Sequence, residues 1–144
     1  PLAGEREGHL GAGLTAHLRG HTDLAALSMS PQIGPLLETF AVQELRRQLH
    51  SAATVATAWH FRTAAGREVD LVLETPNQHI VGVEVKASAS LTQGDFNRLR
   101  KLAGAAGKRF TRGVVLYNGD QLVPFEAHLW AVPLGVLWAG GGAA

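Results

Sequence analysis

The sequence predicts an α/β fold in which a mixed central β-sheet is flanked by helices. Three observations indicate it: two amphipathic helical patterns, three strand-like runs between them, and one continuous apolar run after the second helix. The order helix, three strands, helix, strand is typical of an α/β sandwich, because each helix and strand buries an apolar face against its neighbours. One domain is expected over residues 31–139 of the 144-residue chain.

The first helix is expected over residues 34–50, since Pro35 lies near its first turn and apolar residues recur at the spacing of one helix face. The apolar stripe consists of Leu37, Ala41, Leu45 and Leu49. At about 100° per residue, Glu38 projects inside that stripe. A carboxylate on a core-facing stripe is costly unless it is paired or ligated. Glu38 is therefore expected to point at whatever this helix packs against.

Three strands are expected next, the first over residues 55–62. The second and third form a hairpin over 67–74 and 80–86, joined by five residues of turn-forming composition centred on Asn77. If the hairpin folds about Asn77, residues equally distant from it along the chain face each other. This register places the carboxylates of positions 70 and 84 directly across from one another, about 5 Å apart.

The second half of the chain is expected to add a helix over 94–105 and a strand over 111–117. The strand is a continuous apolar run, which is consistent with cover on both faces of the sheet. Shorter strands are expected at 121–125 and 129–132, followed by a terminal turn at 133–138. The residues assigned to the inner face of the helix are Phe96, Leu99 and Ala103.

Composition excludes several classes of protein. The chain is 46% hydrophobic and 17% charged with a net charge of +1, so no global field indicates a nucleic-acid partner. It contains no cysteine, which excludes disulfides and thiolate sites and suits a cytoplasmic location. No apolar run has the length of a membrane span, and no membrane partner is expected. Residues 1–30 are expected to form a loosely organised helical lead-in, and 140–144 a disordered tail.

Two carboxylates and a lysine form the most informative cluster of the sequence. Asp70 and Glu84 face each other in the expected register, and Lys86 lies on the same strand face as Glu84. Like charges in such positions repel unless a cation lies between them. Asp70, Glu84, the Val85 carbonyl and Glu38 are therefore candidate ligands of Mg²⁺ or Mn²⁺, with Lys86 beside the reacting water or phosphate. The alternative is an exposed polar face on which Lys86 simply neutralises the two acids.

A known family resembles this chain in five segments, which are 34–40, 61–63, 66–74, 83–88 and 113–119. The resemblance is to the C-terminal domain, of unknown function, of a group of prokaryotic AAA-type ATP-binding proteins, and that domain is similar to the PD-(D/E)XK nuclease superfamily. It extends over roughly residues 23–138 and implies a restriction-endonuclease-like core with an acidic site at one end of the sheet.

The resemblance also implies roles for individual residues. Asp70 matches the first acid of the superfamily motif, Glu84 the second and Lys86 its lysine, while Glu38 matches the acid of the first helix. The motif's proline is replaced, since Val69 precedes Asp70. Carried over in this way, the site is expected to be catalytic through Glu38, Asp70, Glu84 and Lys86.

A basic stretch follows the third strand. Between positions 86 and 112 there are seven cations and a single acid, Asp95. On the helix, Arg98 and Lys101 are expected to point outward. This stretch is a candidate for contacts with a phosphate backbone, although a solvated helix face has the same composition. The residues proposed for nucleic-acid contacts are Arg98, Lys101, Lys108, Arg109 and Arg112.

Taken together, these features predict a nuclease-like domain that hydrolyses DNA with Mg²⁺ or Mn²⁺. The resemblance implies that an AAA-type ATPase module precedes Pro1 in a longer chain. A second hypothesis is a non-catalytic docking or nucleic-acid-binding module of a larger ATPase, with a degenerate site. A third is a purely structural oligomerisation domain. The sequence leaves open the oligomeric state and whether the site is active.

Overall fold

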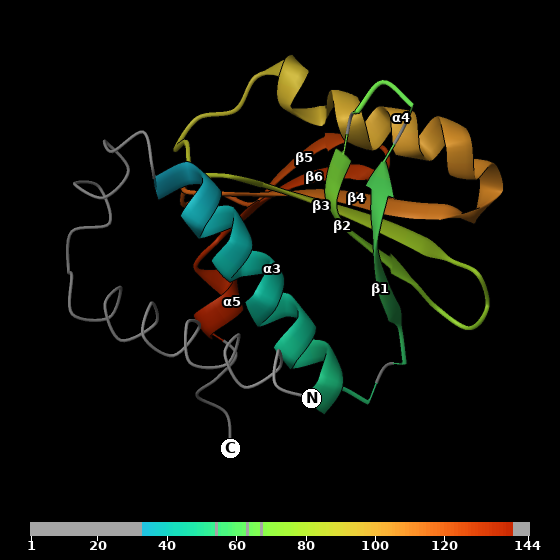
Figure 1. Ribbon diagram of the computed structural model, residues 1–144. Coiled ribbons are helices and arrows are strands. Elements are labelled where there is room, and N and C mark those ends of the chain that lie inside the picture. Colours follow the sequence, from blue (N-terminus) through green and yellow to red (C-terminus); the bar gives the residue numbers. More distant parts are fainter. Residues whose placement is uncertain (1–32, 54, 63, 67, 140–144) are drawn as a thin grey trace.

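Six strands form one mixed β-sheet in the computed structural model, which describes residues 33–53, 55–62, 64–66 and 68–139. Helices cover both faces of this sheet (Figure 1), so the predicted fold class is confirmed. The expected lead-in, the expected tail and Arg67 of the second strand lie outside the described residues. None of the described helices combines the length and the apolar character needed to cross a bilayer.

The elements follow the predicted order, with small changes at their ends. The first strand begins two residues later than expected, the second helix opens with a 3₁₀ turn, and the terminal turn contains a short helix. The elements are α3 (Ile33–Ser51), β1 (Thr57–Arg62), β2 (Glu68–Glu74), β3 (Ile80–Lys86), η1 (Gln93–Phe96), α4 (Asn97–Ala106), η2 (Gly107–Arg109), β4 (Phe110–Tyr117), β5 (Val123–Glu126), β6 (Leu129–Pro133) and α5 (Val136–Ala139).

The strand order across the sheet is β1-β2-β3-β4-β6-β5. The β1–β2, β2–β3 and β5–β6 pairs are antiparallel, whereas β3, β4 and β6 run parallel. The parallel β3–β4 pair requires a crossover, which α4 provides on one face of the sheet (Figure 1). Because α4 follows β3 directly, its first turn lies at the end of the sheet where β3 ends.

The sheet divides the interior into two apolar layers. On the α4 face, Phe96, Leu99 and Leu102 pack against β-strand residues. On the other face, α3 and α5 pack against Leu71, Val83 and their neighbours (Figure 1). The prediction that Phe96 and Leu99 face inward is confirmed, Leu102 is buried beside them, and Ala103, which was also predicted to face inward, is half-buried.

Two paired glycines bring α4 close to the sheet. Gly82 of β3 pairs with Gly113 of β4, and both are buried beneath the helix. A Cβ atom at Gly82 would lie 2.6 Å from Leu102 Cδ2 and 2.8 Å from Leu99 Cδ2. Distances this short do not occur for real Cβ atoms, so the leucines occupy the space that a side chain would need. The glycines therefore set the height of α4 above β3.

Replacement of Gly82 by alanine is expected to destabilise the domain by about 1–3 kcal/mol, because the added methyl group overpacks the contact with α4. The free energy of unfolding in urea measures this effect. Gly104→Ala is the matched control: a Cβ atom at Gly104, which lies in α4, would have no heavy atom within 4 Å, so alanine is expected to stabilise the helix by up to about 1 kcal/mol. Equal stability of Gly82→Ala and the wild type would contradict the close packing.

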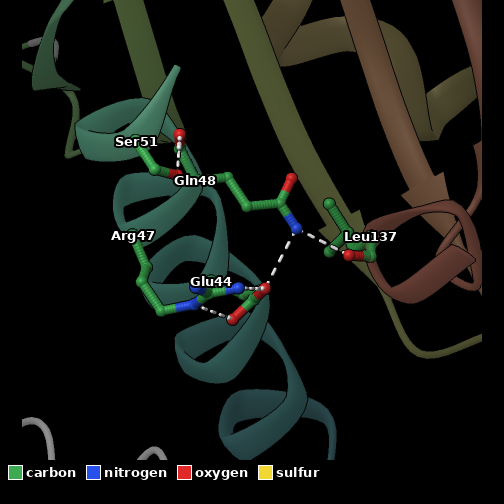
Figure 2. A network of polar contacts seen from close by, with 5 residues as sticks. All are labelled: Glu44, Arg47, Gln48, Ser51 and Leu137. Carbon is green, nitrogen blue, oxygen red and sulfur yellow. Dashed lines mark hydrogen bonds and ion pairs between the residues drawn. The ribbon is translucent and has the colours of Figure 1, made fainter. Parts of the chain in front are cut away.

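A polar network ties α3 to the C-terminal helix α5 (Figure 2). Gln48 Nε2 donates to Glu44 Oε1 at 2.9 Å and to the Leu137 carbonyl oxygen at 2.6 Å. Arg47 holds the same Glu44 carboxylate through Nε at 3.0 Å and Nη2 at 2.6 Å. Ser51 closes the last turn by donating to the Gln48 carbonyl oxygen at 3.1 Å. The hydrogen bond from Gln48 to Leu137 links α3 to α5, and the other contacts lie within α3.

Candidate functional site

The β2–β3 hairpin has the register predicted from its turn. Leu71 pairs with Val83 and Glu74 with Ile80, so residues equally distant from Asn77 do face each other. The backbone ladder between the two strands ends at Leu71. Next to it, the side chain of Asp70 joins the strands, because its Oδ2 accepts a hydrogen bond from the Val85 N–H at 2.8 Å. Asp70 is thereby held against the segment that carries Glu84, although the ladder does not include the direct Asp70–Glu84 pair that the sequence predicted.

Glu84 is the most unusual side chain of the described residues. It is 0% exposed, and neither of its carboxylate oxygens has a hydrogen-bond partner within the described part of the chain. Burial, and next the charge of Asp70, raise the pKa of Glu84 to about 8 from an ordinary value of 4.5. A buried carboxylate without donors is costly when it is ionised. The site is therefore built to favour a proton or a cation at Glu84.

Glu38 belongs to the same electrostatic cluster. It lies near the N-terminal end of α3, which Figure 1 places at the end of the sheet where β3 finishes. Partial burial, followed by the charge of Asp70, raises the pKa of the Glu38 carboxyl, and the charges of Lys86 and Arg98 oppose this shift. The prediction that the helix stripe aims Glu38 at the site is consistent with this coupling to Asp70.

Two cations accompany the three acids. Lys86 lies two residues after Glu84 on β3, on the same strand face. Arg98 reaches in from α4: its Nη1 lies 3.6 Å from Glu84 Oε2, although its side chain is 46% exposed. Both cations counteract the burial that raises the pKa of Glu84. We define the acid cluster as Glu38, Asp70, Glu84, Lys86 and Arg98.

Sequence reasoning placed Arg98 on the outward face of its helix and missed its contact with Glu84. A signal for it was present. In a strand–helix–strand crossover, the helix starts at the end of the sheet where the first strand stops. A residue in the first turn of that helix, such as Arg98, therefore lies over the last residues of β3. The position of Arg98 at the start of α4 was more informative than its angle on the helical wheel.

The remaining basic residues do not converge on the acids. Arg112 pairs in register with Val81, five residues before Lys86 on β3, or about 17 Å along the strand. Its guanidinium lies over the Trp130 ring at 5.5 Å, and Arg109 Nη1 lies 3.6 Å from Glu74 Oε1. Lys101 and Lys108 are exposed. Of the five residues predicted to contact nucleic acid, Arg98 is the one that forms an ion pair with an acid of the cluster, Glu84, in the described structure.

The fit of a metal to these residues depends on Glu84. No group of three or more His, Cys, Asp or Glu side chains within the described ranges is compact enough to form a metal site. Glu38, Asp70 and Glu84 are thus electrostatic neighbours and not a preformed three-carboxylate site. Mg²⁺, however, commonly uses one or two carboxylates and several waters. The buried oxygens of Glu84, which have no hydrogen-bond donor in the described structure, and the carboxylate of Asp70 are the two groups that such a site would use.

A family model described as "Domain of unknown function (DUF4143)" matches residues 33–137. This segment contains every member of the acid cluster. Neither the curated proteins nor the solved structures contain a match to the chain. Because the family match extends over more than half of the 144 residues, the chain belongs to the DUF4143 family, a family of domains of unknown function.

Proposed function

We propose that this domain is a divalent-metal-dependent nuclease that hydrolyses phosphodiester bonds in DNA. The observation that carries the proposal is the buried Glu84 carboxylate, whose two oxygens have no hydrogen-bond partner in the described structure and whose neighbour is a second carboxylate, Asp70. Folding such a group into the interior is unfavourable by itself. A cation bound by Glu84 and Asp70 would offset the free-energy cost of burying the carboxylate and would make the site able to hydrolyse phosphodiester bonds.

In this proposal, each residue of the site has a distinct role. Bound Mg²⁺ or Mn²⁺ supplies a Lewis acid and lowers the pKa of a coordinated water. Asp70 and Glu84 hold the cation, and the Val85 carbonyl is a candidate third oxygen ligand. Lys86, two residues after Glu84 on β3, would donate to the attacking water or to a phosphate oxygen and stabilise negative charge as the bond breaks. Glu38 adds a carboxylate at the rim of the site.

The proposed substrate is DNA, and the proposed partner is an AAA-type ATPase module preceding this domain in a longer chain. Both rest on the segments that resemble the C-terminal domain of ATP-binding proteins. The half-exposed guanidinium of Arg98 supports the choice of a phosphate-containing substrate, because it offers paired N–H donors at the mouth of the acid cluster.

Nicking of supercoiled plasmid in Mn²⁺ tests the proposal. The wild-type domain is expected to convert supercoiled plasmid to the open circular form, and chelation of the metal is expected to stop the reaction. Asp70→Asn is expected to reduce the rate at least about 100-fold, since it weakens a metal ligand. Glu74→Gln is the matched control, because Glu74 lies on the same strand at the other end of the β2–β3 ladder.

The nuclease proposal fails if the wild type nicks no faster than an Asp70→Asn/Lys86→Ala double variant. One observation then favours a second function, a non-catalytic docking or nucleic-acid-binding module. One carboxylate oxygen of Asp70 accepts a hydrogen bond from the Val85 N–H, and this contact stabilises the fold without any metal. A docking module is expected to bind its DNA or ATPase partner equally well with and without a chelator.

A further inference from the structure

Arg98 makes the direct charged contact with the buried acid. Its Nη1 lies 3.6 Å from Glu84 Oε2, longer than a hydrogen bond, so the guanidinium offsets the charge of Glu84 when that carboxyl is ionised but leaves its oxygens without a hydrogen-bond donor in the described structure. Arg98 also opposes the burial and the Asp70 charge that raise the pKa of Glu38. The half-exposed guanidinium of Arg98 thus stabilises negative charge on two carboxylates, Glu38 on a helix and Glu84 on a strand, and acts as a counter-ion shared by both.

The charges of the acid cluster do not balance once all three acids are ionised, as they are when a metal is bound. Glu38, Asp70 and Glu84 contribute three negative charges when ionised, and Lys86 and Arg98 contribute two positive ones, which leaves an excess of one negative charge. A divalent cation converts this excess into one positive charge. A phosphodiester group carries a single negative charge and brings the net charge of the metal-bound cluster to zero. A phosphomonoester carries up to two negative charges and would leave the cluster with a net negative charge. The balance therefore favours an internal phosphodiester as the ligand of the metal-bound site.

We propose that Arg98 is the resident counter-ion of Glu84 and that a divalent cation displaces it, which frees the guanidinium to hold a phosphodiester oxygen of the substrate. The proposal rests on the proposed function, because it takes the metal and the phosphodiester from it. Both states of Arg98 are accessible from its present position, since the side chain is anchored on the first turn of α4 and is half exposed. Bidentate hydrogen bonding to a phosphate group suits a guanidinium.

The proposal makes opposite predictions for metal and for DNA. Arg98 repels a divalent cation about twice as strongly as it repels a proton at the same carboxylate, so removing its charge favours the metal. In Arg98→Met, the Mn²⁺ concentration that gives half of the maximal rise in melting temperature is expected to fall about three- to tenfold. Binding of a 30-base-pair duplex in Ca²⁺, measured by fluorescence anisotropy, is expected to weaken about three- to tenfold.

Matched variants separate the contact from general charge effects. Arg98→Lys keeps the charge and is expected to have nearly the wild-type Mn²⁺ midpoint with weaker DNA binding, because it loses the paired donors. Lys101→Met removes one cation one turn further along α4 and is expected to leave the Mn²⁺ midpoint unchanged. Arg98→Gln repeats the charge removal with a polar side chain in case the methionine variant fails to fold.

The outcomes distinguish this inference from the proposed function. If Mn²⁺ at millimolar concentration does not raise the melting temperature of the wild type, the proposed function fails, and this inference fails with it. If the wild type responds to Mn²⁺ but the two charge-removing variants have an unchanged or higher midpoint, the inference alone is overturned. Unchanged DNA binding in both variants likewise overturns the phosphodiester role of Arg98 and leaves the metal site standing.

Discussion

Replacement of Glu84 by glutamine is expected to stabilise the metal-free domain by about 1–3 kcal/mol at pH 9 and to abolish DNA nicking. Glutamine has nearly the same shape but carries no charge, so it avoids the cost of an ionised group that is 0% exposed and lacks hydrogen-bond partners in the described structure. The increase in the free energy of unfolding is smaller than the full cost of the buried charge, because the amide of the buried glutamine has N–H donors that stay unpaired. Nicking is lost because an amide is a poor ligand for Mg²⁺ or Mn²⁺.

The stabilising effect of Glu84→Gln is expected to disappear near pH 6, where the wild-type carboxyl is already neutral given its pKa of about 8. Urea unfolding at pH 6 and pH 9, together with the plasmid assay, measures both halves of the prediction. Asp120→Asn, which neutralises an exposed carboxylate, serves as the control and is expected to change stability by less than about 0.5 kcal/mol. A glutamine variant less stable than the wild type at pH 9 would mean that Glu84 has a partner which the structure lacks.

The stability of the metal-free domain is expected to fall as pH rises from about 5 to 8. Burial, and then Asp70, raise the pKa of Glu84 from 4.5 in the unfolded chain to about 8 in the folded one, so in this window the folded state binds the additional proton. The free energy of unfolding then decreases by up to about 1.4 kcal/mol per pH unit. The raised pKa of Glu38, which arises from burial first, adds an effect of the same sign.

Unfolding in urea across pH 5 to 9, for the wild type and for Glu84→Gln, isolates this contribution as a difference between the two proteins. Saturating Mn²⁺ is expected to oppose the trend, because a metal ion binds the deprotonated carboxylate and stabilises the fold more at pH 8 than at pH 6. Parallel pH profiles for the two proteins would show that Glu84 keeps an ordinary pKa in the folded state. The cluster would then be an exposed polar face, as the sequence also allowed.

Much of the fold could be predicted from local patterns. The hairpin register followed from a turn centred on Asn77, and the pairing of Leu71 with Val83 confirms it. The two helices were predicted from apolar residues that recur every 3.6 residues, the pattern of a helix buried on one face. The parallel core strand was predicted from a continuous apolar run, the pattern of a strand covered on both faces. The resemblance to a domain of unknown function is confirmed by the DUF4143 match. Its links to nucleases and to an ATPase module stay predictions.

Other features depend on contacts between elements distant in the sequence. The basic stretch was read as one patch, but β4 carries Arg112 toward the far end of the sheet from Lys86, so the stretch divides. Leu102 is buried because α4 packs over Gly82, where a Cβ atom would lie 2.6 Å from Leu102 Cδ2. A helical wheel contains no information about which end of the sheet a helix covers.

The sequence by itself determined the register of the hairpin that carries Asp70, Glu84 and Lys86, because strand alternation and turn symmetry are local properties. Only the tertiary structure decided that Glu84 is buried, with no hydrogen-bond donor among the described residues, and that Arg98 forms an ion pair with it. The physical reason is that burial and long-range ion pairs arise when α4 closes over the sheet, and the height of that helix depends on the Gly82–Gly113 pair and not on any residue of the acid cluster.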